Sequence, residues 1–286
     1  MSASVSISSI ASPLASLTST QIKKLESTTG FNFKGHTVKV FDHTIDNLKL
    51  AQKAIWAAKA LLPYGAGNQI VDVYKTQGES AARVEFMRKE EKKLSVPGHA
   101  QQAMRVGAGN CGEHSAMTFS LLAAEPHKAP ISWVSERGID HAYVVIGDPR
   151  DPDYGEKNTV VADAWPTFGV AHTLAEGLFK TPEVKETQPP GSGDKDYQLK
   201  SRSPLGSTII NRELPAGKPL LMYLAQAHQE KDILYQQWFS ATDPTTQYQN
   251  ENATDKKVFN QQPHGWVEQK LNQYEKAEKE GFPDSY

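Results

Sequence analysis

The sequence has a single cysteine, no long apolar run and almost no net charge. One cysteine among 286 residues excludes an intrachain disulfide, so folding does not depend on an oxidising compartment. No apolar stretch approaches the roughly 18 residues that a membrane-spanning helix requires. The net charge is −2 and the basic residues are scattered, which argues against a surface that follows nucleic acid or acidic lipid. These absences predict a soluble protein with no membrane span and no nucleic-acid partner.

The chain begins with a stretch that lacks charge and is rich in serine. Its first 20 residues, MSASVSISSIASPLASLTST, contain eight serines and no charged side chain. They also lack the basic start and the apolar block of a secretory signal peptide. One interpretation is a plain polar tail, and the other is a secretion address, because such beginnings resemble those of bacterial type III effectors. In both cases we expect residues 1–35 to be a disordered N-terminal segment.

Helical periodicity dominates the part of the chain before the cysteine. Apolar residues recur at steps of three and four over residues 44–62, and residues 79–94 predict a second, more exposed helix. A short third helix ends at the glycines 107 and 109. The segment that starts at Cys111 is apolar or small on nearly every side, which is typical of a buried helix.

Three short β-rich runs follow the cysteine helix. They are ISWVSERG from residue 131, HAYVVIGD from residue 141 and NTVVADAWP from residue 158, the last two separated by a loop full of turn residues. A buried helix followed by at least three strands predicts an α+β catalytic core over residues 36–180.

The rest of the chain is less regular. Residues 180–204 are rich in Pro, Gly and charge, so we expect residues 181–218 to be a loop-rich connection that can still belong to the core. Residues 219–241 and 264–282 have helical patterns, and the polar run between them, 242–263, predicts a surface connection. We therefore expect residues 219–286 to form a C-terminal helical segment in which Trp238 and Phe239 pack against a helix.

Cys111 lies directly after the sequence GAGN and before the buried helix. In the first turn of a helix, unpaired N–H groups and the helix dipole stabilise an anion, which favours a thiolate over a thiol. Gly109 lets an extended substrate approach the sulfur closely. The N–H of Cys111 is placed to bind an oxyanion, with Asn110 as a further donor candidate. Cys111 is therefore our candidate nucleophile.

A candidate base stands at the start of one apolar run, and a candidate orienting group stands at the end of another. His141 opens one strand, where its imidazole can meet Cys111 across a groove, whereas His114 would lie below the sulfur along the same helix. Asp163 follows the apolar residues of another strand and can hold the imidazole in one tautomer. Trp165 can cover the His–Asp pair and exclude water.

The three motifs that carry these residues are GNCGE, DHAYVVIG and VVADAW. Their order and their separations of 30 and 22 residues resemble those in compact members of the transglutaminase-like branch of the papain-like cysteine enzymes. The resemblance covers about residues 97–170. It implies an α+β fold in which the buried cysteine helix packs on an antiparallel sheet that carries the histidine and the aspartate, here with extra N- and C-terminal helices. Papain also has an oxyanion glutamine, a role that we assign to neither Gln101 nor Gln102.

We expect a cysteine-dependent acyl-transfer enzyme that uses Cys111, His141 and Asp163, with Asn110, Gly109 and Trp165 at the substrate. The resemblance implies a protein glutamine deamidase, a cysteine protease or a transamidase, which requires no metal and no cofactor. With the serine-rich start, it suggests a secreted type III effector that acts as a monomer on a protein of a host cell.

Three alternatives stay open. The chain can be a catalytically degenerate papain-like module that binds a host partner through its C-terminal helices, or an amidase of cell-wall peptides. Cys111, His114, His141 and Asp163 can also be considered as a metal site, although structural zinc usually draws on more than one cysteine. The other histidines have no partner pattern and are expected at surface or core positions: His36, His43, His99, His127, His172, His228 and His264.

Overall fold

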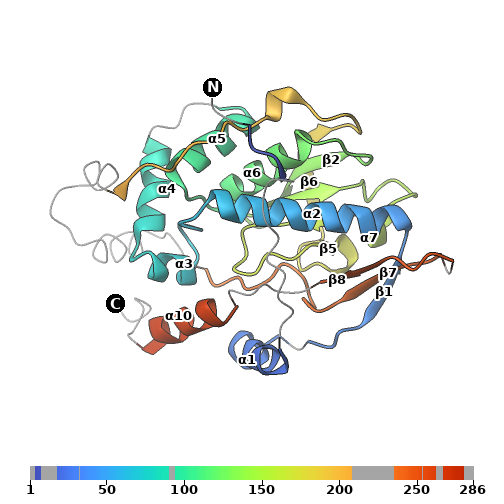
Figure 1. The fold of residues 1–286 in the computed structure, drawn as a ribbon, viewed down its shortest axis with the longest axis horizontal. Helices are drawn as coiled ribbons and strands as arrows, with labels where there is room; N and C mark the ends of the chain where they lie inside the picture. The colour runs from blue at the N-terminus through green and yellow to red at the C-terminus, as the bar shows by residue number, and fades with distance from the viewer. Residues whose placement is uncertain are drawn as a thin grey trace.

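The computed structural model describes residues 4–7, 18–31, 33–89, 94–207, 235–252, 254–261 and 267–279. These residues form an α+β fold with eight α-helices and two sheets (Figure 1). The helices are α1 (Ser19–Thr29), α2 (Asp42–Leu61), α3 (Ile70–Lys75), α4 (Glu79–Lys89), α5 (Val96–Val106), α6 (Cys111–Ala123), α7 (Gly155–Asn158) and α10 (Val267–Lys279). The strands are β1 (Thr37–Val40), β2 (Ile131–Glu136), β3 (Ala142–Ile146), β4 (Val160–Ala162), β5 (His172–Thr173), β6 (Pro182–Gln188), β7 (Gln247–Asn250) and β8 (Val258–Asn260).

The larger sheet has the order β5-β4-β3-β2-β6, and every neighbouring pair is antiparallel. Its side chains alternate between two faces, as the pleat of a strand requires. Val144 and Ile146 of β3 face the main core, whereas Tyr143 and Val145 face a smaller cluster on the other side. Helix α6 packs on β2 and β3, and α2 packs on both α6 and β4. The three predicted strands are confirmed as β2, β3 and β4.

Helix α6 is the buried helix that the sequence predicts. Every residue from Glu113 to Ala123 is buried, because small and apolar side chains occupy all sides and let α2 and α5 approach closely. Its first turn is closed by Glu113, whose carboxylate accepts a hydrogen bond of 2.6 Å from the backbone N–H of Asn110. The helices predicted before it are confirmed as α2, α4 and α5, with the end of the predicted second helix at residues 90–93 outside the described residues.

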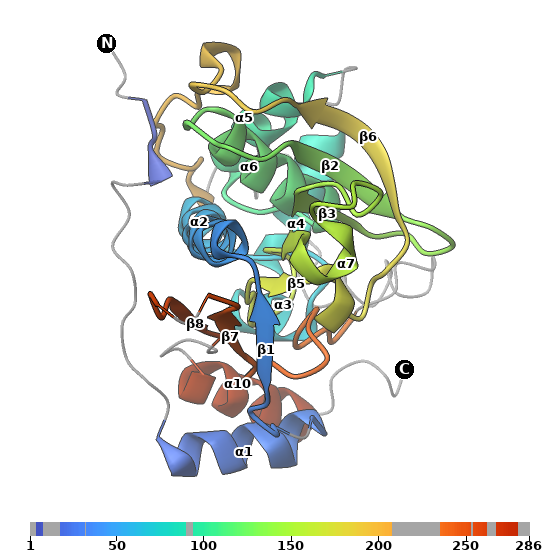
Figure 2. The ribbon, with the colours of Figure 1, turned by 90° about the vertical axis from the view of Figure 1, so that its right-hand side faces the viewer.

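The smaller sheet joins an early segment of the chain to a late one. Strand β1 pairs with β7 in parallel, and β7 pairs with β8 in antiparallel fashion. Helices α1 and α10 lie side by side at one end of the molecule (Figure 1, Figure 2). Lys24 of α1 bridges them, because its Nζ lies 2.6 Å from Asn272 Oδ1 and 3.3 Å from Glu275 Oε1.

Part of the N-terminal prediction is wrong. Residues 19–29, expected to be disordered, form α1, which Thr18 and Gln21 cap and which buries Leu25 completely. The polar composition hides this helix because Leu25 is its only buried side chain. Residues 1–3, 8–17 and 32 lie outside the described residues.

Three predictions for the C-terminal half need correction. Residues 182–188, expected in a loop, form edge strand β6 against β2. The expected surface connection contains β7 and β8, with Tyr248 fully buried. Residues 235–241 are not helical, because their backbone bonds to Asn68, Thr167 and Phe168 instead. The rest of that predicted helix, residues 219–234, lies outside the described residues, whereas the last predicted helix is confirmed as α10.

The segment around Trp238 still packs as the sequence indicates. Trp238 and Phe239 are buried in a second apolar cluster together with Val267 and Leu271 of α10. The Trp238 ring meets the Tyr274 ring edge to face at 4.9 Å. Helix α10 is thus anchored to the rest of the fold. In the described part of the chain, no helix is both long and apolar enough to cross a membrane.

Candidate active site

Cys111 is the first residue of α6 and is partly exposed. The residue before it, Asn110, has an extended backbone conformation and serves as the N-cap. The Cys111 thiol points at the loop that leads into β3, with its Sγ 3.9 Å from the carbonyl oxygen of Asp140. The sulfur therefore lies at the helix N-terminus and faces the loop that carries His141.

The glycine loop before Cys111 is braced by a neighbouring turn. The N–H of Gly109 donates to the carbonyl of Gly65 at 3.2 Å, and the N–H of Tyr64 donates to the carbonyl of Gly107 at 2.9 Å. A Cβ on Gly109 would overlap the Cβ of Glu113, so only glycine lets the loop pass this close to the first turn of α6.

His141 and Asp163 meet at one end of the larger sheet. Strands β3 and β4 are antiparallel, so the start of β3, which His141 precedes, lies beside the end of β4, which Asp163 follows. His141 Nε2 lies 2.8 Å from Asp163 Oδ2, and both side chains are almost fully buried. The second carboxylate oxygen accepts a hydrogen bond of 3.1 Å from the N–H of Trp165. The structure thus brings together the predicted histidine and aspartate.

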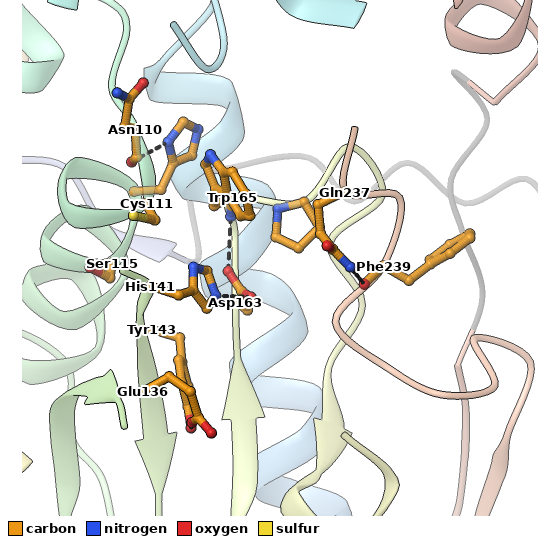
Figure 3. Close-up of polar contacts among 12 residues, drawn as sticks. Asn110, Cys111, Ser115, Glu136, His141, Tyr143, Asp163, Trp165, Gln237 and Phe239 are labelled. Carbon is orange, nitrogen blue, oxygen red and sulfur yellow. Dashed lines mark hydrogen bonds and ion pairs between the residues drawn. The ribbon is translucent and has the colours of Figure 1, made fainter. Parts of the chain in front are cut away.

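The other imidazole nitrogen faces the cysteine. Figure 3 shows the His141 ring between Cys111 and Asp163. Nδ1 of His141 is buried and has no hydrogen bond of regular geometry. Burial alone would lower the pKa of His141, but the charge and hydrogen bond of Asp163 outweigh it, and the interaction with Cys111 adds to them, so that this pKa rises to about 10. The imidazole is therefore held as an imidazolium at neutral pH.

Aromatic side chains enclose the imidazole. The His141 ring centroid lies 4.4 Å from that of Phe179, 5.1 Å from that of Trp165 and 5.6 Å from that of Tyr143. Trp165 stands over the His–Asp pair in Figure 3, and its Nε1 donates to Asn68 Oδ1 at 2.9 Å. This enclosure limits water around the His–Asp bond and strengthens it.

Glu136 was not predicted as part of this region. It lies at the end of β2 and accepts a hydrogen bond of 2.7 Å from the Tyr143 hydroxyl. Its other oxygen accepts from the backbone N–H of Lys180 and from both the N–H and the hydroxyl of Thr181. Burial would raise the pKa of Glu136, but these bonds from Thr181 and Tyr143 lower it. Glu136 thus fixes the chain directly after Phe179. The only signal for it in the sequence is a carboxylate that ends an apolar strand.

His114 does not act as the partner of Cys111. Its Nδ1 lies 3.0 Å from the carbonyl oxygen of Asn110, so this nitrogen carries the proton and donates it to the backbone. Burial lowers the pKa of His114 to about 4, with a further contribution from the charge of Lys59. The imidazole is therefore neutral, and the preference for His141 over His114 agrees with this geometry.

The oxyanion candidates are placed differently from one another. Gly109 is part of the braced loop, but the side-chain amide of Asn110 points away from His141 in Figure 3. Gln101 exchanges hydrogen bonds with the backbone of Lys200 at 3.1 and 2.9 Å, which directs it elsewhere. The backbone N–H groups at the start of α6 thus remain as donors for an oxyanion.

The metal alternative finds no matching arrangement. His114 is bonded to the backbone, and both oxygens of Asp163 are used by His141 and Trp165. Within the described ranges, no group of three or more His, Cys, Asp and Glu side chains is suited to hold a metal ion. Of the other histidines, His36 lies 3.0 Å from Glu176, whereas His228 and His264 fall outside the described residues.

The chain was compared with known proteins in three ways. Protein-family models, curated proteins and solved structures give no match to it.

Proposed function

We propose that this protein is a cysteine-dependent acyl-transfer enzyme with a Cys111–His141–Asp163 triad. The observation that carries the proposal is the buried His141 imidazole, bonded through Nε2 to Asp163 at 2.8 Å, with its Nδ1 facing Cys111 (Figure 3). A charged buried pair is costly, and a histidine that only packs the core gains nothing from it. The pair is instead explained if His141 serves as the base beside a nucleophilic cysteine.

The first half of the reaction forms a thioester. The Cys111 thiolate attacks the carbonyl carbon of an amide, and the N–H groups at the start of α6 bind the oxygen as it becomes negative. The C–N bond then breaks, and the leaving ammonia or amine takes a proton from His141 Nδ1. Asp163 stabilises the imidazolium before this transfer and keeps the proton of Nε2 in place afterwards.

The second half releases the acyl group. Neutral His141 accepts a proton from a water molecule, which attacks the thioester carbonyl, and the C–S bond breaks to return the Cys111 thiolate. The product is a carboxylic acid, so a glutamine side chain is deamidated or a peptide bond is cleaved. An amine in place of water gives transamidation.

The fold supports a transglutaminase-like or papain-like core for this chemistry. The cysteine begins a buried helix that packs on an antiparallel sheet, and the histidine and the aspartate lie at one end of the central strands. This arrangement is the one implied by the motifs GNCGE, DHAYVVIG and VVADAW. We also propose that the enzyme is a secreted effector with a host protein as its substrate. The serine-rich first 20 residues support this.

Mass spectrometry of candidate host proteins tests the activity. Incubation with the wild type is expected to convert a glutamine to glutamate or to create a new peptide terminus, and Cys111→Ala is expected to abolish either change. Gly112→Ala is the matched control, because a Cβ there meets nothing within 4 Å. If Cys111→Ala modifies substrates as fast as the wild type, the proposal is wrong. Binding of a host protein without any covalent change would favour the degenerate binding module instead.

A further inference from the structure

A charge cluster with a buried carboxylate at its centre lies behind the candidate active site and joins three helices. It consists of Lys59 on α2, Asp72 on α3 and Lys270 on α10, and Lys270 is far from the other two in the sequence. Nζ of Lys270 lies 2.8 Å from Asp72 Oδ1, and the two side chains are 15% and 8% exposed. An ion pair this enclosed is costly to break, because one partner is left as an unpaired buried charge.

Asp72 connects this pair to a tight turn. Its second oxygen, Oδ2, accepts a hydrogen bond of 2.9 Å from the backbone N–H of Ala66. The preceding residue, Gly65, has a φ of +75°, and a Cβ at that position would overlap the Asp72 carboxylate. The turn therefore rests directly on the carboxylate, whose position fixes that of the turn.

The turn at Gly65 and Ala66 also holds the loop before the nucleophile. The carbonyl of Gly65 accepts the hydrogen bond of 3.2 Å from Gly109, and Gly65 forms a parallel bridge with Ala108. Gly109 precedes Cys111 by two residues. A continuous path of polar contacts thus runs from the ammonium group of Lys270 to the residues that position the sulfur and the first N–H groups of α6.

The same cluster touches the other side of the site. Nζ of Lys59 donates to the carbonyl of Pro166 at 2.6 Å, in the loop that follows Asp163. Burial would raise the pKa of Asp72, but the charges of Lys270 and Lys59 outweigh it and hold this pKa at about 2. Burial and the charge of Lys270 in turn lower the pKa of Lys59 to about 7. The charged or titratable groups around Asp72 are thus the two lysines, with Asp163 and His114 nearby.

We propose that Lys270 is a positioning residue for Cys111, acting through Asp72 on the loop of residues 107–110. Helix α10 is then a required part of the enzyme and not an appendage. The inference rests on the proposed function, since it assigns Lys270 a role in presenting the nucleophile. Displacement of a nucleophile by about 1 Å can cost as much as 10²-fold in rate, so a loosened glycine loop has a large effect.

The test compares two ion pairs made by the same helix. Lys270→Met removes the enclosed pair with Asp72, whereas Glu275→Gln removes the more exposed pair with Lys24, whose side chains are 39% and 33% exposed. The readout is the rate of Cys111 alkylation by iodoacetamide between pH 5 and 9, which needs no substrate and has only one thiol to report. Thermal melts show whether each variant is folded.

Lys270→Met is expected to slow alkylation at pH 6 about tenfold or more. Glu275→Gln is expected to stay within about twofold of the wild type, as for an exposed pair. Lys270→Arg, which keeps the charge, is expected to restore most of the rate. If Lys270→Met does not fold, Lys270→Gln takes its place, because it keeps a donor for Asp72 without the charge.

An unchanged alkylation profile in a folded Lys270 variant, with only a lower melting temperature, would show a purely structural role and overturn the inference. Failure of the proposed function has a different signature. In that case the wild-type thiol itself would react no faster at pH 6 than an ordinary thiol, and Cys111→Ala would retain any activity found.

Discussion

His114 and His141 are both buried near Cys111, yet their pKa values are shifted in opposite directions. Burial lowers the pKa of His114 to about 4, whereas Asp163 and Cys111 overcome burial and raise that of His141 to about 10. His141 has a carboxylate at 2.8 Å, and His114 has only a backbone carbonyl. Titratable neighbours whose environments separate their pKa values in this way divide acid–base roles between them. Here His141 carries the proton and His114 is a neutral structural group.

Asp163→Asn should uncouple this arrangement while keeping its shape. The amide oxygen can still accept from His141 Nε2, but the negative charge that raises the pKa of His141 is lost, so burial lowers that pKa. We expect acyl transfer to fall by about 10²–10⁴-fold, the range for loss of a positioned acid–base group. The steady-state rate on the substrate found by mass spectrometry measures this.

Cys111 alkylation gives the independent check on Asp163→Asn. The variant should react at least about tenfold more slowly than the wild type at pH 6, and the difference should shrink above about pH 9, where an ordinary thiol ionises unaided. Equal rates at pH 6 would mean that the Asp163 charge does not reach the cysteine through His141.

Stability should fall on the alkaline side because of His141. Its pKa is raised in the folded protein to about 10 from the ordinary value of 6.5, so folding is favoured by the bound proton below pH 6.5. That contribution, on the order of a few kcal/mol, is lost as the pH rises through about 10. Urea unfolding of the wild type and Asp163→Asn between pH 6 and 10 measures it. The two stability curves should converge at high pH, and parallel curves would refute the linkage.

Acid should destabilise the protein through His114 and His172. Burial lowers the pKa of each to about 4. Between pH 6.5 and 4 the unfolded chain therefore binds protons at these histidines that the folded protein does not bind. Their stabilising contribution is complete above pH 6.5 and declines as the pH falls. His114→Asn removes one such group and keeps a donor for the Asn110 carbonyl, so its unfolding free energy should decline less between pH 7 and 5. A decline equal to that of the wild type would contradict this origin.

Asp163 could be predicted as a site candidate from the sequence because it breaks an apolar pattern. Asp163 follows Val160 to Ala162, all fully or almost fully buried, and a carboxylate at that point has no packing role. The strand β6 could not be predicted, because PEVKETQ lies at the edge of the sheet, is mostly polar and has no buried residue. Strand β7, QYQN, buries one aromatic ring and otherwise resembles a polar connection.

The charge cluster behind the candidate active site could not be predicted from the sequence either, for a different reason. Lys59 and Lys270 stand in helical patterns with ordinary spacing, whereas Asp72 lies in α3, for which the sequence analysis predicts no helix. Their contact depends on how α3 and α10 pack, which is a tertiary property. Tertiary contacts also decide the structure of residues 235–241. Their sequence has helical periodicity, but their backbone forms hydrogen bonds with Asn68 and with residues 167–168 instead.

The two glycines that flank Asn110 and Cys111 should respond in opposite ways to alanine. A Cβ on Gly109 would overlap the Glu113 side chain, which caps α6, so Gly109→Ala must displace either the loop or the cap. We expect a loss of about 1–3 kcal/mol in unfolding free energy, as for overpacking at a tight contact, and a tenfold or larger fall in Cys111 alkylation at pH 6.

Gly112 has a helical backbone and open space around its Cα, so Gly112→Ala should stabilise α6 by about 0.5–1 kcal/mol. Its alkylation rate should stay within about twofold of the wild type. Urea unfolding and iodoacetamide kinetics on the pair measure both effects, and an equal loss of reactivity in the two variants would show that the glycine loop does not position the sulfur.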